Sequence, residues 1–220
     1  MFPASPIPAA AETWVLATLA ALAVHLLAEA RGWSLLRAVS KLAASTGFLL
    51  TAHAAGALEL DWGRWVFAGL ALSWIGDAAL LGRGRATFLL GLVAFLLGHV
   101  GYVIAFVVHG FSPTAVWFAA PALLVVAVVV DRWLRDHVGD MLAAVRAYIL
   151  VISTMLTLAI AAWYAGASHL LLIGAVSFYL SDLSVARDRF VHQEFTNRLW
   201  GLPAYYLGQL ALALAVLGLR

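Results

Sequence analysis

The chain has 220 residues, of which 65% are hydrophobic and 11% are charged. Soluble domains carry about 25% charged residues, so this chain has too few polar groups to cover a water-soluble globule. It contains no cysteine, which excludes disulfides, thiol nucleophiles and cysteine-ligated metals. The formal net charge of +2 comes from basic residues in separate short loops, which offers no patch for nucleic acid. We therefore expect an integral membrane protein without a nucleic-acid partner and without a cofactor.

Apolar segments of about 20 residues, the length that a membrane helix needs, occur eight times along the chain. We expect them near residues 13–30, 35–57, 62–82, 86–109, 113–133, 142–163, 167–186 and 198–219. They lack the alternation of a membrane β-barrel, and their connections are short. The sequence therefore predicts an all-α, polytopic bundle of eight transmembrane helices, with residues 1–220 forming a single transmembrane domain. The N-terminus has no basic region, which favours a retained first helix over a cleaved signal peptide.

The lysines and arginines are distributed unevenly between the two sides of the predicted bundle. Eleven of the thirteen lie in or beside the first, third, fifth and seventh connections, and only Arg64 and Arg220 lie on the other side. The eleven are Arg31, Arg37, Lys41, Arg83, Arg85, Arg132, Arg135, Arg146, Arg187, Arg189 and Arg198. The positive-inside rule then places both termini outside the cytoplasm. We expect a bacterial inner-membrane protein whose basic end faces the cytoplasm.

Two aspartates interrupt apolar segments near that basic end. Asp77 lies in "SWIGDAALL" of the third predicted helix, and Asp182 lies in "FYLSDLSVA" of the seventh, which runs in the same direction. Counting 1.5 Å per residue from the arginines that follow places both roughly 8–9 Å inside the boundary. An ionised carboxylate in hydrocarbon costs roughly 2.5–3.5 kcal/mol, so each should face a watery cavity, pair with a cation or hold a proton. A purely structural pair with Lys41 or Arg83 is the alternative.

The surroundings of the two aspartates are similar enough to suggest an internal repeat. Tyr102 follows Asp77 by 25 positions and Tyr206 follows Asp182 by 24, and two arginines follow each aspartate. This pattern is typical of a parallel repeat of two four-helix halves, although apolar segments also resemble one another by chance.

Ser73 and Lys41 accompany the aspartates at the basic end. Ser73 precedes Asp77 by four residues and so shares its helix face. Lys41, the only lysine, enters the bundle from the same side as both acids, although a lysine whose ammonium reaches back to the interface would look the same.

The fourth and eighth helices carry further polar residues. Asn197, Tyr205 and Gln209 are spaced i, i+8 and i+12, close to one helix face. Interfacial tyrosines and interhelical hydrogen bonds would also explain such residues. His99 shares a face with the tyrosine three residues later, and its helical depth of roughly 20 Å argues against direct contact with the acids unless the helix tilts or the cavity is tall. The histidines lack the spacing of a zinc site on one helix, so we expect no metal.

The segments "SWIGDAALL", "FLLGLVAFLLGHVGY", "FYLSDLSVA" and "RLWGLPAYYLGQ" together resemble the YhhN family of membrane proteins, whose characterised members are lysoplasmalogenases. The resemblance covers nearly the whole chain. It implies hydrolysis of the vinyl ether bond of a lysoplasmalogen, either lysoplasmenylethanolamine or lysoplasmenylcholine. The products are a fatty aldehyde and a glycerophospho-amine. The expected partners are therefore a single-chain ether lysolipid and the surrounding membrane lipids, and the oligomeric state stays open.

The resemblance also assigns residues to roles. It implies two catalytic aspartates, Asp77 and Asp182, which would protonate the alkene carbon and stabilise the oxocarbenium ion with one proton between them, as in glycosidases. Which aspartate is the acid stays open. The expected substrate-binding residues are Lys41, Ser73, His99, Tyr102, Asn197, Tyr205, Tyr206 and Gln209. Lys41 is expected to hold the phosphate or the glycerol hydroxyls.

Two other classes of protein remain compatible with the residues alone. Acids in helices and a repeat also occur in proton-coupled transporters of small solutes or lipids. A structural or regulatory membrane protein would tolerate neutralisation of both acids. The clustering of polar residues at one end, away from the bilayer midplane, favours the enzyme over the transporter.

Overall fold

Eight long helices account for most of the chain. The computed structural model describes residues 7–82 and 84–218, and within these ranges it contains no strand. The helices are α1 (Ala9–Arg31), α2 (Ser34–Ala54), α3 (Asp61–Ala79), α4 (Arg85–His109), α5 (Pro113–Leu134), α6 (Leu142–Tyr164), α7 (His169–Ala186) and α8 (Phe195–Ala215). Each overlaps one predicted segment, so the all-α class and the eight helices are confirmed. Arg83, Arg220 and the predicted end of the last helix at residue 219 lie outside the described residues.

The helix ends differ from the predicted ends by a few residues, for local reasons. Helix α2 stops at Ala54, three residues early, because Gly56 adopts a left-handed backbone (φ 82°) and a short 3-10 turn, Ala57–Glu59, follows. Helix α7 is continued by a π-helical turn, Arg187–Val191. A third turn, Gly139–Met141, precedes α6. Three connections therefore contain helical turns of their own, which an apolar-window count does not separate from the helices.

Five of the eight helices are long and apolar enough to cross a membrane by themselves: α1, α4, α5, α6 and α7, the last two together with their adjoining turns. The other three, α2, α3 and α8, contain more polar residues, which lower their mean hydropathy. Helix α5 shows what the outer surface is like, since Trp117 and Phe118 are 79% and 77% exposed. Apolar side chains at that exposure require lipid contact. The protein is thus a polytopic helical membrane protein.

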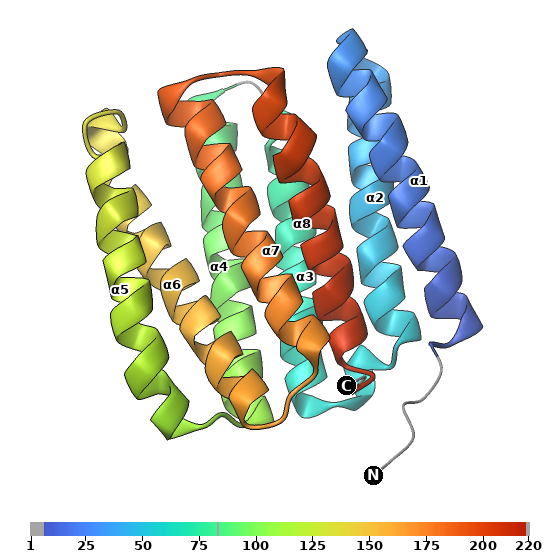
Figure 1. The fold of residues 1–220 in the computed structure, drawn as a ribbon. Helices are drawn as coiled ribbons and strands as arrows, with labels where there is room; N and C mark the ends of the chain where they lie inside the picture. The colour runs from blue at the N-terminus through green and yellow to red at the C-terminus, as the bar shows by residue number, and fades with distance from the viewer. Residues whose placement is uncertain (1–6, 83, 219–220) are drawn as a thin grey trace.

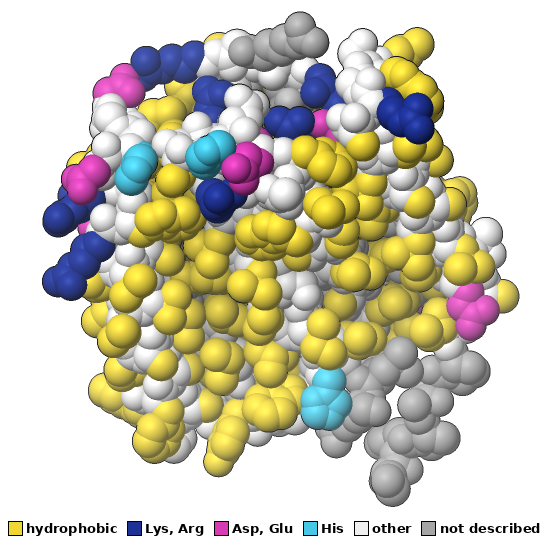
Figure 2. Space-filling model, turned by 45° about the horizontal axis from the view of Figure 1, so that its top comes forward, with side chains coloured by type: hydrophobic (Ala, Val, Ile, Leu, Met, Phe, Trp, Pro, Cys, Tyr) yellow, Lys and Arg dark blue, Asp and Glu magenta, His cyan; other side chains and the backbone are white. Residues whose placement is uncertain are grey.

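The helices form four antiparallel hairpins, α1/α2, α3/α4, α5/α6 and α7/α8, whose members pack closely on each other. Helices α3, α4, α7 and α8 occupy the centre, with α1/α2 on one side and α5/α6 on the other (Figure 1). Helix α1 begins at the same end of the bundle at which α8 finishes. At the opposite end, Figure 2 shows most of the charged side chains gathered together above a largely hydrophobic surface.

Glycines bring the helices of both central hairpins into close contact. A Cβ on Gly69 of α3 would lie 2.6 Å from a tyrosine ring of α4, and a Cβ on Gly174 of α7 would lie 2.9 Å from the carbonyl oxygen of Gly208 in α8. Such small-residue contacts are the usual way in which membrane helices approach closely. Gly69 and Gly174 each precede an aspartate, Asp77 and Asp182, by eight residues. The two acid-bearing helices therefore pack on their partners at equivalent positions.

The absence of cysteine makes the orientation of the bundle directly testable. Ala165 lies in the α6–α7 connection, at the end with few charges, and Asp136 lies in the α5–α6 connection, at the basic end; both are exposed. In a bacterial inner membrane, a membrane-impermeant maleimide should label Ala165→Cys in intact cells and Asp136→Cys only after permeabilisation, because basic loops are retained in the cytoplasm. The reverse labelling pattern would contradict the predicted orientation.

Candidate functional site

A cavity of about 370 Å³ lies within the bundle and reaches the charged end. Its inner polar lining consists of Lys41, Asp77, Tyr148, Asp182 and Tyr205, which come from five different helices. Its walls are mostly apolar, with Leu92, Phe95, Ile149, Ile152 and Phe178 among them. Near the basic connections the lining becomes charged again, with Glu29, Arg37, Asp188, Arg189 and Arg198. The cavity therefore combines charged residues near the basic connections, apolar walls and the two acids.

Asp77 is held by three donors from two neighbouring helices. The Lys41 ammonium Nζ lies 3.1 Å from Oδ1, and the hydroxyls of Ser45 and Tyr205 donate to Oδ2 at 2.6 and 2.7 Å. The Asp77 side chain is only 3% exposed. Since all three partners donate, the arrangement suits an ionised carboxylate, which can only accept hydrogen bonds. Tyr206 contacts two of these donor residues. Its hydroxyl donates to the Lys41 carbonyl at 3.2 Å and lies 3.3 Å from the Ser45 hydroxyl.

Asp182 has a different set of partners. The Tyr148 hydroxyl donates to Oδ1 at 3.2 Å, and Nε2 of His99 lies 3.2 Å from Oδ2. The other ring nitrogen of His99, Nδ1, is 2.7 Å from the carbonyl oxygen of Phe95. The His99 side chain is fully buried, whereas Asp182 is 12% exposed and lines the cavity.

The hydrogen-bond chemistry of His99 requires one extra proton in this pair. A carbonyl oxygen only accepts, so Nδ1 of His99 must carry a hydrogen to bond with Phe95. In a neutral ring Nε2 would then present a lone pair to an ionised Asp182, and the contact would be repulsive. The contact becomes favourable when either the ring or the carboxyl holds a proton. Within the described part of the chain, neither Nε2 nor Oδ2 has a hydrogen-bond partner, so the two atoms depend on each other. The contact therefore depends on a proton between Nε2 and Oδ2.

His99 contacts Asp182 despite the depth that argued against direct contact. The depth count used Arg187 as the membrane boundary for Asp182, but helical structure continues from there to Val191. Asp182 is thus nine residues from the end of its helical segment, or about 13 Å, which is closer to the roughly 20 Å of His99. The two side chains span the remaining difference.

The partners of the two aspartates follow the same pattern in both halves of the chain. Asp77 on α3 receives partners from α2, the helix before it, and from α8. Asp182 on α7 receives partners from α6, the helix before it, and from α4. Each acid thus contacts the preceding helix of its own half and the last helix of the other half.

The remaining predicted site residues do not line the cavity. The Tyr102 hydroxyl donates to Oε1 of Gln209 at 2.7 Å, and both side chains are fully buried, so this bond ties α4 to α8. The Ser73 hydroxyl donates to the Gly69 carbonyl of its own helix at 2.9 Å. These three residues are not part of the cavity lining.

Asn197 belongs to a separate polar group at the α7–α8 connection. Its side chain accepts a short hydrogen bond from Arg187 and donates to Oδ1 of Asp188 at 3.2 Å and to the His192 carbonyl at 2.7 Å. The structure thus brings Lys41, Asp77, Asp182, His99, Tyr205 and Tyr206 together but leaves Asn197 outside this group.

Tyr148 and Ser45 contact the aspartates, and neither was among the predicted site residues. Tyr148 precedes Asp182 by 34 positions, and Ser45 precedes Asp77 by 32. The suspected repeat relates the second helix to the sixth. It therefore predicts a partner for each aspartate at a similar spacing on the helix before it. The signal was present, but a single tyrosine near a helix end is indistinguishable from an interfacial aromatic residue without the repeat.

This fold and site define a polytopic helical membrane protein with two buried acids at the end of an internal cavity. The chain belongs to the YhhN family, whose model matches residues 36–216. It is similar to the protein named lysoplasmalogenase TMEM86A of Bos taurus, with 27% identity over 226 residues that cover 97% of this chain and 83% of the bovine protein. No solved structure matches the chain.

The buried pair of Lys41 and Asp77 should reveal itself in stability measurements. Lys41→Met leaves an uncompensated carboxylate in a side chain that is 3% exposed, and should lower the free energy of unfolding by about 3 kcal/mol. Adding Asp77→Asn should restore most of this loss, because both charges are then absent. The thermal unfolding of purified variants in detergent provides the measurement.

Arg64→Met serves as the matched control, since Arg64 pairs with Asp61 at an exposed position (61% and 86%). Exposed pairs contribute little, so this variant should unfold like the native protein. A double variant that is less stable than Lys41→Met would contradict the ion-pair interpretation.

Proposed function

We propose that this protein is a membrane-embedded hydrolase that cleaves the vinyl ether bond of lysoplasmalogens. The observation that carries the proposal is a cavity lined by two carboxylates, one buried and surrounded by donors, the other 12% exposed and paired with a histidine. Acid-base cleavage needs this kind of asymmetry, because one group must give a proton while another remains an anion. The similarity to a protein named a lysoplasmalogenase supports the same reaction.

The cavity suits a lipid with one chain and a polar head. Its volume of about 370 Å³ lies in the range of small-molecule sites. Apolar side chains such as Leu92, Phe95 and Ile152 line the same cavity as the acids. The first carbons of an alkenyl chain would lie against them. A lysolipid offers this combination, with the vinyl ether located between its chain and its head group. The substrate would therefore place its scissile bond beside the aspartates.

We assign the role of acid to the pair of Asp182 and His99. Asp182 lines the cavity whereas His99 is fully buried, so the proton leaves from the carboxyl and His99 supplies it from behind. Transfer of this proton to the alkene carbon next to the chain converts the vinyl ether into an oxocarbenium ion. Tyr148, which donates to the other carboxyl oxygen, fixes the orientation of Asp182. The general acid contributes about 100-fold or more in such reactions.

Asp77 then acts as the anion that stabilises the oxocarbenium ion. Lys41, Ser45 and Tyr205 hold its carboxylate in the cavity wall. Water adds to the cation and loses a proton, which returns to the pair of Asp182 and His99. The hemiacetal that results breaks down to the fatty aldehyde and the glycerol hydroxyl of the head-group product. No proton is gained or lost over the cycle.

The finer architecture follows from the same site. We propose that all eight helices cross the bilayer as two parallel four-helix halves, with both termini on the non-cytoplasmic side and the cavity open toward the cytoplasm. The equivalent partner patterns of the two aspartates and the equivalent positions of Gly69 and Gly174 support the repeat. The basic residues around the cavity mouth support the orientation.

Substitution of the acids tests the reaction. Asp182→Asn removes the proton donor and Asp77→Asn removes the anion, so each should lower kcat by about 100-fold or more. The double variant should be scarcely worse than either single variant, because the two groups serve one step. Aldehyde release from a lysoplasmalogen in detergent is the measurement, and Asp140→Asn, whose side chain is 68% exposed, is the control.

His99→Gln separates the acid role from a structural one. This variant keeps an amide near Asp182 but cannot supply a proton, so kcat should fall and its pH profile should change while the protein still elutes as a single species. If Asp77→Asn and Asp182→Asn both retain native rates, the acids are structural and the proposed reaction is wrong. If the native protein does not hydrolyse the lipid but carries out proton-coupled uptake into vesicles, the result would instead favour a transporter.

A further inference from the structure

The mouth of the cavity carries more positive than negative charge. Three arginines, Arg37, Arg189 and Arg198, and two acids, Glu29 and Asp188, belong to its lining. Arg189 is held in place by the Phe88 ring, since its guanidinium carbon lies 4.2 Å from the ring centroid. The mouth therefore has an excess of one positive charge, which is the charge that a single phosphodiester would balance.

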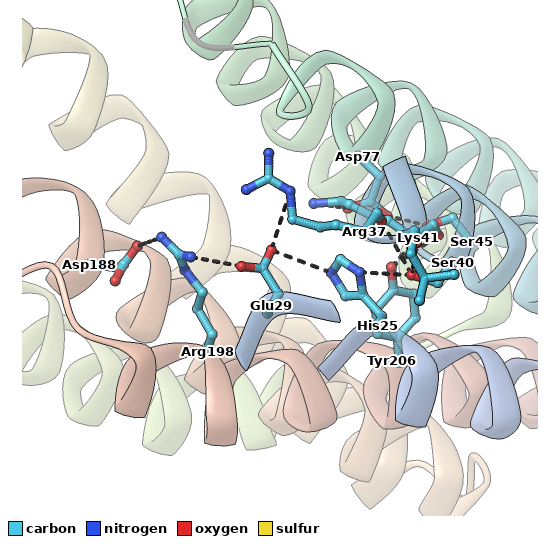
Figure 3. A network of polar contacts seen from close by, with 11 residues as sticks. His25, Glu29, Arg37, Ser40, Lys41, Ser45, Asp77, Asp188, Arg198 and Tyr206 are labelled. Atoms are coloured by element: carbon cyan, nitrogen blue, oxygen red, sulfur yellow. Dashed lines mark hydrogen bonds and ion pairs between the residues drawn. The ribbon is translucent and has the colours of Figure 1, made fainter. Parts of the chain in front are cut away.

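The two acids are already shared with Arg198. Its Nη1 donates to Oε2 of Glu29 at 2.7 Å, and its Nη2 lies 3.4 Å from Oδ2 of Asp188. Figure 3 shows Glu29 between Arg198 on one side and Arg37 and His25 on the other. Glu29 is 11% exposed and joins the three of them into one network.

Arg37 is the member of this network with unused hydrogen-bonding capacity. Its Nε is buried and has no hydrogen-bond partner within the described residues, since the nearest acceptor, Oε1 of Glu29, is 3.9 Å away. A buried donor without an acceptor is costly, and such a group in a cavity wall indicates a ligand that supplies the acceptor. A guanidinium matches the oxygens of a phosphate with two parallel hydrogen bonds.

Lys41 is not free for this task. Its ammonium lies 3.1 Å from Asp77 and its side chain is 13% exposed, so it serves the inner acid site. The charged groups that remain near the mouth are therefore the arginines and their two acids.

We propose that Arg37, supported by Arg198 and Arg189, binds the phosphodiester of the lysolipid head group at the cavity mouth. The inference rests on the proposed function for the identity of the lipid, but its chemistry is that of phosphate recognition. A lipid bound in this way has its phosphate at the mouth and its vinyl ether farther in, beside Asp77 and Asp182.

The test measures binding of an analogue that cannot be hydrolysed. The probes are a saturated 1-O-alkyl lysophosphatidylethanolamine and the 1-O-alkylglycerol of the same chain length, which lacks the phosphate. Arg37→Gln should weaken binding of the phospholipid by about tenfold and leave binding of the alkylglycerol unchanged. Arg37→Lys, which keeps the charge but not the paired donors, should give an intermediate loss. Retained alkylglycerol binding also shows that each variant is folded.

Arg132→Gln is the matched control, because Arg132 is exposed at the same end of the bundle and does not line the cavity. It should bind both probes like the native protein. Equal phospholipid affinity of the native protein and Arg37→Gln overturns the inference. If inorganic phosphate binds the native protein as tightly as the phospholipid does, the site recognises free phosphate. That result overturns the lipid head group as the ligand.

These outcomes are separate from the fate of the proposed reaction. A phosphate-dependent effect of Arg37→Gln in a protein that releases no aldehyde leaves the head-group site standing and overturns the hydrolase. Aldehyde release with an unchanged affinity of Arg37→Gln does the opposite.

Discussion

The requirement that a carboxylate buried in a membrane protein find donors determines much of this structure. Asp77 and Asp182 are 3% and 12% exposed, and transfer of an unpaired ion from water costs several kcal/mol. The donors come from α2, α4, α6 and α8, so the pairing of charges and the packing of the central helices depend on one another. Glycine contacts at equivalent positions hold α3 against α4 and α7 against α8, whereas the donors to each acid come from other helices.

The two acids differ because their partners differ. A lysine and two hydroxyls surround Asp77 with donors and favour an anion, whereas the fixed Nδ1 hydrogen of His99 leaves Asp182 with a contact that needs a proton. Equivalent positions on α3 and α7 thus have unequal chemistry. This inequality is what an acid-base reaction on an uncharged bond requires.

The cavity combines the polar and apolar surfaces that a lysolipid presents. Arginines and carboxylates line it near the basic connections, and apolar side chains line it together with the two acids. Lys41 pairs with Asp77, whereas Nε of Arg37, one turn earlier on the same helix, has no hydrogen-bond partner within the described residues.

The sequence alone determined the helices and the basic end, because these depend on apolar length and on charge count along the chain. It also indicated Lys41 as a possible partner of Asp77. Tertiary structure decided which faces meet: the contact of His99 with Asp182, the role of Tyr148 and the place of Asn197 outside the site. A helical period shows which residues share a face but does not identify the helix opposite that face. That choice is made by the close packing of eight helices, in which one turn of displacement moves a side chain by about 5 Å.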